Sequence, residues 1–193
     1  MDEIRGFVDH FIFQDEQDGY KVMSFSSTAE DIIVVGTFPG IDEGENLVVK
    51  GEYIDHATYG RQFKADSFKV DEPTDSASIE RYLVSGAIKG VGKAIAKRII
   101  KRFGSDALRI MEEEPEKLAL IKGISLKKAV GIADHISEKK ELRDAIIFLD
   151  QYGIKSNMAL RVYGEYGSEI YSIIRENPYK LADHIDGIGF MTA

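Results

Sequence analysis

The sequence lacks cysteine, long apolar runs and a recognisable targeting signal. Without cysteine, neither a disulfide bond nor a thiolate metal site can form. No apolar run approaches the roughly 20 residues that a membrane-spanning helix needs. The amino terminus, Met1-Asp-Glu-Ile-Arg5, has neither the basic start nor the apolar stretch of a secretory signal. These absences predict a cytoplasmic protein in a reducing setting, with no membrane association.

Residue types that carry catalysis or bind metals are scattered along the chain. The four histidines, His10, His56, His135 and His184, stand singly, without a paired spacing and without cysteine partners. No nucleophile–base pair and no pair of carboxylates stands out from the background. We therefore expect no metal site, no cofactor and no catalysis in this segment.

Charge is distributed unevenly. The net charge is −8, but residues 1–72 carry 6 Lys/Arg against 16 Asp/Glu, whereas residues 73–193 carry 19 against 17. Because charges beyond about 8–10 Å are largely screened at physiological salt, the local surface decides whether a phosphate can bind. Residues 86–102 contain six cations and no acid, namely Lys89, Lys93, Lys97, Arg98, Lys101 and Arg102. This stretch is either a solvated helix face or a phosphate-binding surface, and the complete absence of acids favours the second.

The pattern of apolar residues changes from strand-like to helix-like near residue 73. Five short runs rich in β-branched and aromatic residues predict strands over Ile4–Ile12, Tyr20–Ser26, Ile32–Phe38, Leu47–Tyr53 and Phe63–Val70. Pro73 then opens a stretch of helix-capping residues. The sequence thus predicts an α+β protein, with a small five-stranded OB-like β-barrel in residues 1–72, a linker at 73–78 and an all-α region at 79–193.

The all-α region contains an internal repeat. Helical periodicity predicts helices over Ile79–Ser85, Lys93–Arg102, Ser105–Glu113, Pro115–Ala119, Leu126–Lys139, Glu141–Tyr152, Ser156–Tyr166, Ser168–Glu176 and Pro178–Asp183. A shift of 63 residues places Gly90 on Gly153 and Pro115 on Pro178. Residues 79–193 are therefore expected to be two copies of one unit, the second ending inside its last helix.

Each unit contains turns of the form apolar–x–Gly–apolar–Gly/Ser, followed by a helix. Glycine lets a phosphate approach the main chain, and the helix that follows presents unpaired N–H groups to it. The pattern occurs in Ile88-Lys-Gly-Val-Gly-Lys-Ala-Ile-Ala-Lys-Arg-Ile99 and again in residues 185–193. A variant of it occurs in residues 120–130, where Ser125 replaces the second glycine. Tyr152-Gly-Ile-Lys-Ser156 has lost the second glycine, which predicts a structural hairpin.

Contacts between these glycine turns and the DNA phosphates carry little sequence information. The expected DNA-binding residues are Lys89, Gly90, Gly92, Lys93, Lys97, Arg98, Lys101, Arg102, Lys122, Gly123, Lys127, Lys128, Gly187 and Gly189, although the last two serve equally well in packing.

Two other patterns in the sequence could bind a ligand. Gly90-Val-Gly-Lys93 is not a nucleotide-binding Walker loop, because that loop needs Gly at 87 and Ser or Thr at 94, where the chain has Ala87 and Ala94. Most aromatic residues of the barrel are needed for its core. Tyr59, Arg61 and Phe63 are the candidates for stacking on bases.

The glycine turns resemble helix-hairpin-helix motifs, and the whole chain resembles the amino-terminal region of stand-alone RecD-like DNA helicases of superfamily 1. The resemblance is carried by Ile4-Arg-Gly-Phe-Val8, Tyr59-Gly-Arg-Gln-Phe63 and Glu176-Asn-Pro-Tyr-Lys-Leu181, in that order along the chain. It implies a parent protein that uses ATP and Mg²⁺ to move 5′ to 3′ on DNA in repair or recombination. Its partners would be single-stranded DNA or a single-strand/double-strand junction, and motor domains carboxy-terminal to this segment.

Two other interpretations remain open at this point. A Holliday-junction-binding subunit of the RuvA kind also joins such a barrel to two hairpins, although the 63-residue duplication argues against it. A protein-interaction scaffold, in which the hairpins only pack, belongs to a different functional class.

Overall fold

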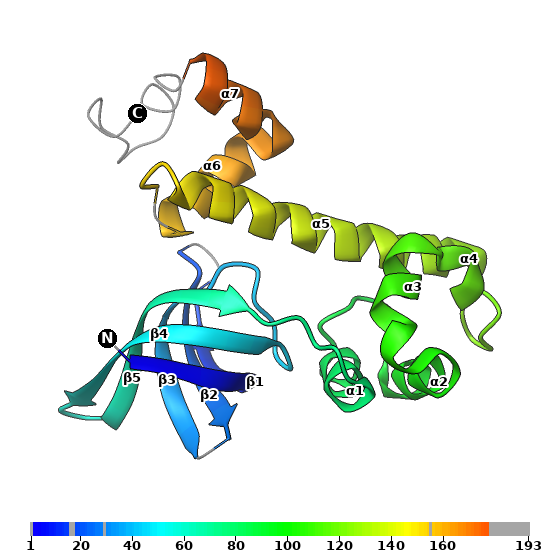
Figure 1. Cartoon of the computed structure of the whole chain (residues 1–193), viewed down its shortest axis with the longest axis horizontal. Helices are drawn as coiled ribbons and strands as arrows, with labels where there is room; N and C mark the ends of the chain where they lie inside the picture. Colours follow the sequence, from blue (N-terminus) through cyan, green and yellow to red (C-terminus); the bar gives the residue numbers. More distant parts are fainter. Residues whose placement is uncertain (1, 16–17, 29, 155, 178–193) are drawn as a thin grey trace. The chain divides into compact units, whose positions relative to one another are not determined.

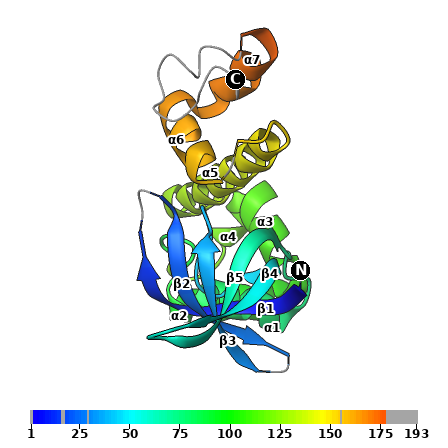
Figure 2. The ribbon, with the colours of Figure 1, turned by 90° about the vertical axis from the view of Figure 1, so that its left-hand side faces the viewer.

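The amino-terminal part of the chain is a closed β-barrel. The structure is a computed structural model that describes residues 2–15, 18–28, 30–154 and 156–177. The strands are β1 (Asp2–Gln14), β2 (Tyr20–Ser27), β3 (Asp31–Thr37), β4 (Asn46–His56) and β5 (Gly60–Val70). Their order around the barrel is β1-β2-β3-β5-β4, and β4 pairs antiparallel with both β1 and β5, whereas β3 pairs with β5 in parallel (Figures 1 and 2). The predicted five-stranded OB-like barrel is confirmed.

Alternation along the strands builds the core of the barrel. Leu47 and Val49 of β4 point inward and are 1% and 0% exposed, while Lys50 points to solvent. At Gly51, next to the bulge in β4, a side chain could not be accommodated, because its Cβ would lie 2.0 Å from the Lys64 carbonyl oxygen of the paired strand. Glycine here lets β4 and β5 remain close enough to close a small barrel.

The helical part repeats its elements at the interval seen in the sequence. The helices are α1 (Ser76–Val84), α2 (Lys93–Phe103), α3 (Ala107–Glu113), α4 (Pro115–Leu118), α5 (Leu126–Asp150), α6 (Ser156–Tyr166) and α7 (Ile170–Glu176), with 3₁₀ turns η1 (Gly104–Asp106) and η2 (Gly167–Glu169). The series α2–η1–α3 and α6–η2–α7 have the same element lengths and begin 63 residues apart. Within the described residues, no helix combines the length and apolar character needed to cross a membrane.

One helix corrects the prediction. The expected break between a helix ending at Lys139 and another starting at Glu141 does not exist, because α5 continues through this region as a single helix of 25 residues (Figure 1). The segment Ser137-Glu-Lys-Lys-Glu-Leu-Arg143 contains neither glycine nor proline and consists mainly of good helix formers. The buried side chains of α5 change near this point from one hydrophobic core, which includes Ile132, to another, which includes Ala145.

The backbone groups into two compact units. The first contains Met1–Phe13, Lys21–Gly36 and Ile41–Glu138, and the second contains Gln14–Tyr20, Thr37–Gly40 and the helical segment from Lys139 onward. The helical core of the first unit includes Leu83, Ile99 and Met111, whereas that of the second includes Leu149, Val162 and Ile170. Each copy of the repeat therefore buries its own apolar side chains.

Within the first unit, α1 is tied to the barrel. Arg81 donates a hydrogen bond to Oδ1 of Asn46 at 3.0 Å, and its guanidinium carbon lies 3.9 Å from the centre of the Phe7 ring. This combination of hydrogen bond and cation–π contact uses both the planar face and the edge of the guanidinium group.

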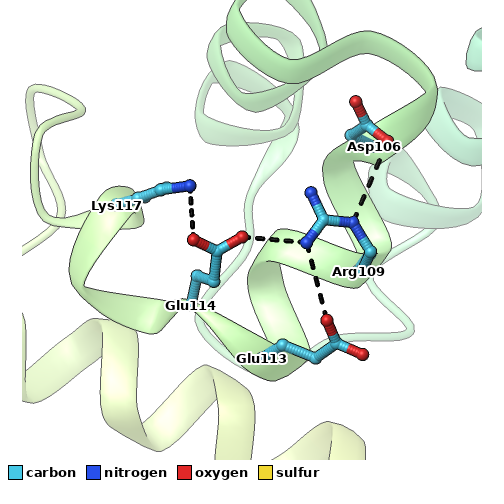
Figure 3. A network of polar contacts seen from close by, with 5 residues as sticks. All are labelled: Asp106, Arg109, Glu113, Glu114 and Lys117. Carbon is cyan, nitrogen blue, oxygen red and sulfur yellow. Dashed lines mark hydrogen bonds and ion pairs between the residues drawn. The ribbon is translucent and has the colours of Figure 1, made fainter.

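A network of charged side chains connects α3 with α4. Arg109 lies 2.8 Å from Oε1 of Glu114 and 3.5 Å from Oε2 of Glu113, and Lys117 pairs with Glu114 from the next helix (Figure 3). The pKa of the Glu114 carboxyl is lowered, first by the hydrogen bond from Lys117 and then by that from Arg109. The network holds the short helix that leads into the second glycine turn.

Candidate nucleic-acid interface

Two glycine turns of the first unit have the same backbone geometry. Residues 88–92 form hairpin 1 and residues 121–125 form hairpin 2, 33 positions further along the chain. Gly90 has φ +88° and Gly123 has φ +98°, a region that L side chains rarely adopt. Each turn is closed by one bond of 3.0 Å, from Val91 N–H to the Ile88 carbonyl or from Ile124 N–H to the Ile121 carbonyl. A helix follows each turn at once.

The two turns differ in how they cap that helix. In hairpin 1 the N-cap of α2 is Gly92, which supplies no side-chain hydrogen bond. In hairpin 2 the hydroxyl oxygen of Ser125 accepts a bond from the Lys128 N–H at 3.2 Å. A side chain at Gly92 would meet no heavy atom within 4 Å, and its φ of −83° is open to any residue. Hairpin 1 thus leaves the first N–H groups of α2 available to an external acceptor, whereas hairpin 2 satisfies one of its own.

Cations surround hairpin 1. Lys89, Lys93, Lys97 and Lys101 are exposed and form no ion pair within the described part of the chain. The first turn of α2 contains no acid, although acids there would favour the helix dipole and a lysine opposes it. An arrangement that works against local helix stability is well suited to an anion supplied from outside.

The two hairpins contact each other's helices. Nη1 of Arg98, from α2, donates a hydrogen bond of 2.7 Å to the carbonyl oxygen of Lys122 in hairpin 2. In the other direction, Cε of Lys128, from α5, lies 3.5 Å from the position that a Cβ at Gly90 would occupy. Lys128 therefore joins the cations of hairpin 1, although in the sequence it belongs to hairpin 2.

The remaining predicted residues fall into three groups. Lys122, Gly123 and Lys127 are exposed at hairpin 2, and Arg102 is exposed on α2 with its guanidinium carbon 5.7 Å from the Phe103 ring centre. Gly187 and Gly189 lie outside the described residues.

The turn at Tyr152–Ile154, which was predicted to be structural, closes by two hydrogen bonds. One of 3.1 Å runs from the Ile154 N–H to the Leu149 carbonyl, and one of 2.9 Å runs from the Gly153 N–H to the Asp150 carbonyl. This pair of bonds is a helix C-cap that ends α5.

The barrel candidates for base stacking are not equivalent. Tyr59 is 72% exposed at the turn between β4 and β5, with its ring 4.9 Å from that of His56. Arg61 lies over the Tyr53 ring, its guanidinium carbon 4.2 Å from the ring centre. Phe63 is a correction, because it is 0% exposed and makes an edge contact with Tyr53 at 5.0 Å. A fully buried ring offers no face to a base, and so small a barrel needs this aromatic residue in its core.

The structure also draws attention to residues that sequence reasoning did not single out. Leu126 and Val130 are 58% and 43% exposed on the first turns of α5. They occupy the positions that correspond to Lys93 and Lys97 of α2 after the 33-residue shift. Aligning the two hairpins with each other, rather than the two larger copies, would have revealed this substitution of apolar residues for cations.

An OB barrel followed by helix-hairpin-helix units defines the class of this protein. Residues 1–73 match the family "ATP-dependent DNA helicase YrrC, OB-fold domain", and residues 81–138 match the SAM-like helix-hairpin-helix tandem. Residues 138–193 match the helix-hairpin-helix domain of the ATP-dependent RecD2 DNA helicase.

A curated protein shows the same resemblance. The ATP-dependent RecD2 DNA helicase of Deinococcus radiodurans is 27% identical over 183 residues, which are 91% of this chain and 25% of that protein. The chain is therefore similar, along its length, to the OB-fold and helix-hairpin-helix domains of RecD2-type helicases, and the predicted resemblance is confirmed. It spans about a quarter of the length of the relative that it matches.

Proposed function

We propose that this chain is a DNA-binding segment of a RecD-like helicase and that it grips the sugar-phosphate backbone at hairpin 1 without reading sequence. The observation that carries this proposal is the coincidence of two features at one place. The N-cap at Gly92 leaves N–H groups of α2 unpaired, and exposed lysines free of acidic neighbours in the sequence surround it. Backbone N–H groups and cations are the partners that phosphate oxygens take, and neither distinguishes one base from another.

Within this proposal each group has a defined task. The α2 N–H groups and Gly90 admit a phosphate close to the main chain, and Lys93 and Lys128 supply counter-charge on either side of the turn. Lys97 and Lys101 extend the cationic face along the next phosphates, one helical turn apart each. Arg98 holds hairpin 2 beside hairpin 1 and retains donors on its other nitrogen atoms.

The chemistry of the parent protein would take place outside this segment. We propose that the parent hydrolyses ATP with Mg²⁺, moves 5′ to 3′ along DNA in repair or recombination, and binds nucleotide in motor domains joined to this one. Hairpin 1 does not fit ATP, because Ala87 and Ala94 stand where a Walker loop has glycine and a hydroxyl residue. The segment before it is the helix α1, where such a loop follows a strand. We propose that the segment itself is non-catalytic.

A fluorescence anisotropy titration tests the proposal. The triple variant Lys93→Ala/Lys97→Ala/Lys101→Ala should lose most of its affinity for DNA, and its log K against log salt slope should fall by about 0.7–0.9 for each phosphate contact removed. The matched control Lys50→Ala/Lys64→Ala/Lys69→Ala removes the same charge from the exposed barrel surface and should bind as the unsubstituted chain does. Unchanged affinity and salt slope in the first variant would show that hairpin 1 does not grip phosphate, and a marked preference for four-way junctions would favour a RuvA-like role.

A further inference from the structure

Helix α5 contacts hairpin 1 with three side chains from one of its faces. Lys128, Ile132 and His135 are separated by four and then three positions, so they lie along the same side of the helix. Cε of Lys128 and Cγ1 of Ile132 lie 3.5 and 3.9 Å from the position that a Cβ at Gly90 would occupy. Nε2 of His135 lies 3.4 Å from the carbonyl oxygen of Ala87, the residue before the hairpin. One face of α5 thus contacts both the turn and the residue that leads into it.

The hydrogen bond between His135 and Ala87 has one possible direction. A carbonyl oxygen can only accept, so the imidazole donates and a proton lies on Nε2. A neutral ring with its proton on Nδ1 could not make this bond. The His135 side chain is half-buried, so water competes for the bond less than it would at an exposed side chain. The contact therefore fixes the tautomer of His135 and holds the Ala87 carbonyl on the α5 side.

The segment that enters hairpin 1 depends on contacts of this kind. Residues 85–87 follow α1 and belong to no helix or strand, and Gly86 has φ +91°. Within the described part of the chain, side chains bind both polar backbone groups of Ala87. Its N–H donates to Oγ of Ser85 at 3.3 Å, and its carbonyl accepts from His135. Loss of the His135 bond would release one of the two polar groups that fix this residue.

The internal repeat does not predict this role. At the 33-residue shift between the hairpins, His135 corresponds to Arg102, whose guanidinium lies beside the Phe103 ring. The residue of α2 that reaches hairpin 2 is Arg98, which donates to the Lys122 carbonyl. Each helix therefore holds a main-chain carbonyl of the other hairpin or of its entry, but it does so from a different position along the helix.

We infer that His135 is a positioning residue of hairpin 1. By holding the Ala87 carbonyl, it keeps the turn, the α2 N–H groups and Lys128 arranged around one phosphate. The neutral ring has a single N–H, which the Ala87 carbonyl takes, so His135 acts through Ala87 and not on the phosphate. This role rests on the phosphate contact proposed above and adds the residue that orders the site.

The experiment measures affinity for labelled DNA by anisotropy at about pH 8, where histidine side chains are ordinarily neutral. His135→Leu removes the donor but keeps an apolar side chain, and it should weaken binding by about threefold. The slope of log K against log salt should stay the same, because no phosphate contact is lost. His135→Gln offers an N–H donor at a similar reach and should bind as the unsubstituted chain does. The matched control His10→Leu, on the exposed surface of β1, should leave affinity unchanged.

Hydrogen exchange tests the positioning role without DNA. The Val91 N–H closes hairpin 1 by its bond to the Ile88 carbonyl, so its exchange reports how well the turn is held. In His135→Leu this amide should exchange about threefold faster, in line with the loss of one weak bond, and in His135→Gln it should not. The Ile99 amide in the buried centre of α2 should keep its rate, whereas a general loss of stability would accelerate both.

Three results would overturn the positioning role. They are unchanged affinity in His135→Leu, an equal loss in His135→Gln, and a lower salt slope in His135→Leu, which would mean direct phosphate contact. His135→Asn, whose shorter amide ends before Ala87, is measured beside the leucine variant and should behave in the same way. It keeps the test decisive if leucine at this position prevents folding, which circular dichroism shows.

The outcomes also distinguish this role from the function on which it rests. If the triple lysine variant of hairpin 1 loses affinity while His135→Leu does not, the phosphate contact stands and the positioning role is wrong. If the triple lysine variant binds DNA as the unsubstituted chain does, the phosphate contact itself is wrong. Faster exchange of Val91 in His135→Leu would then still show that His135 holds the turn.

Discussion

Arg98 and Lys122 connect the two glycine turns of the first unit, because Nη1 of Arg98 donates a hydrogen bond of 2.7 Å to the carbonyl oxygen of Lys122. The bond spans 24 residues and leaves Arg98 with donors for another acceptor. It places a residue of the helix after hairpin 1 in the turn of hairpin 2. A side chain that sequence reasoning assigned to phosphate alone therefore also has an intramolecular partner.

Removal of this bond should weaken both stability and binding. Arg98→Met keeps the length of the side chain and its helix propensity, and it should lower the free energy of unfolding by about 1 kcal/mol. Urea denaturation measures this change. The control is Arg102→Met on the same helix. In the part of the chain that the structure describes, the Arg102 guanidinium contacts only the Phe103 ring, so this substitution should cost less stability. Equal losses for both variants would show that the bond to Lys122 contributes nothing of its own.

The caps of the two hairpins can be exchanged. Gly92→Ser gives hairpin 1 the hydroxyl cap of hairpin 2, so its helix should become slightly more stable while an N–H group is withdrawn from phosphate. We expect DNA affinity to fall by about tenfold, the value of one charge-assisted hydrogen bond. Ser125→Gly makes the opposite change and should raise affinity while lowering the thermal midpoint. Gly164→Ser on α6, where a side chain also meets open space, is the matched control and should leave affinity unchanged.

Lys93 should have opposite effects on folding and on binding. It stands at the first position of α2, where a positive charge opposes the helix dipole, so Lys93→Glu should stabilise the fold by about 0.5 kcal/mol. The same change places a carboxylate at the phosphate site and should reduce DNA affinity by more than Lys93→Ala does. Thermal denaturation and anisotropy together test this opposition. Lys64→Glu, which alters the charge of the exposed barrel surface equally, should leave binding unaffected.

The network around Glu114 should make stability depend on pH. The pKa of the Glu114 carboxyl is lowered by hydrogen bonds from Lys117 and Arg109, so its contribution is present above the ordinary carboxyl pKa and is lost as pH falls through the lowered value. Glu114→Gln should therefore lower the free energy of unfolding at pH 7. Below about pH 4 this free energy should approach that of the unsubstituted chain. Urea unfolding at several pH values measures the difference. Glu116→Gln, next to the network but absent from its ion pairs in the described structure, should show no such dependence. A difference in the free energy of unfolding between Glu114→Gln and the unsubstituted chain that stays constant at all pH values would contradict this account.

Local features of the fold could be predicted because short-range chemistry determines them. Glycine is favoured at positions 90 and 123 because the backbone turns there with positive φ, and a helix starts directly after each turn. Alternating apolar residues placed the five strands, and the 63-residue repeat recurs in the lengths of the helices. The exception is α5, for which two helices were predicted although no glycine or proline between Ser137 and Arg143 would end one.

The sequence by itself determined the barrel, the glycine turns, the basic stretch around Lys93 and the resemblance to RecD-like helicases, because each is encoded by neighbouring residues. Only the tertiary structure decided that Lys128 belongs with Gly90, that Arg98 reaches Lys122, and that Phe63 is buried. The first two relations join residues 38 and 24 positions apart, and the third depends on how much space a closed barrel leaves inside. They follow from packing, which periodicity and composition describe only on average.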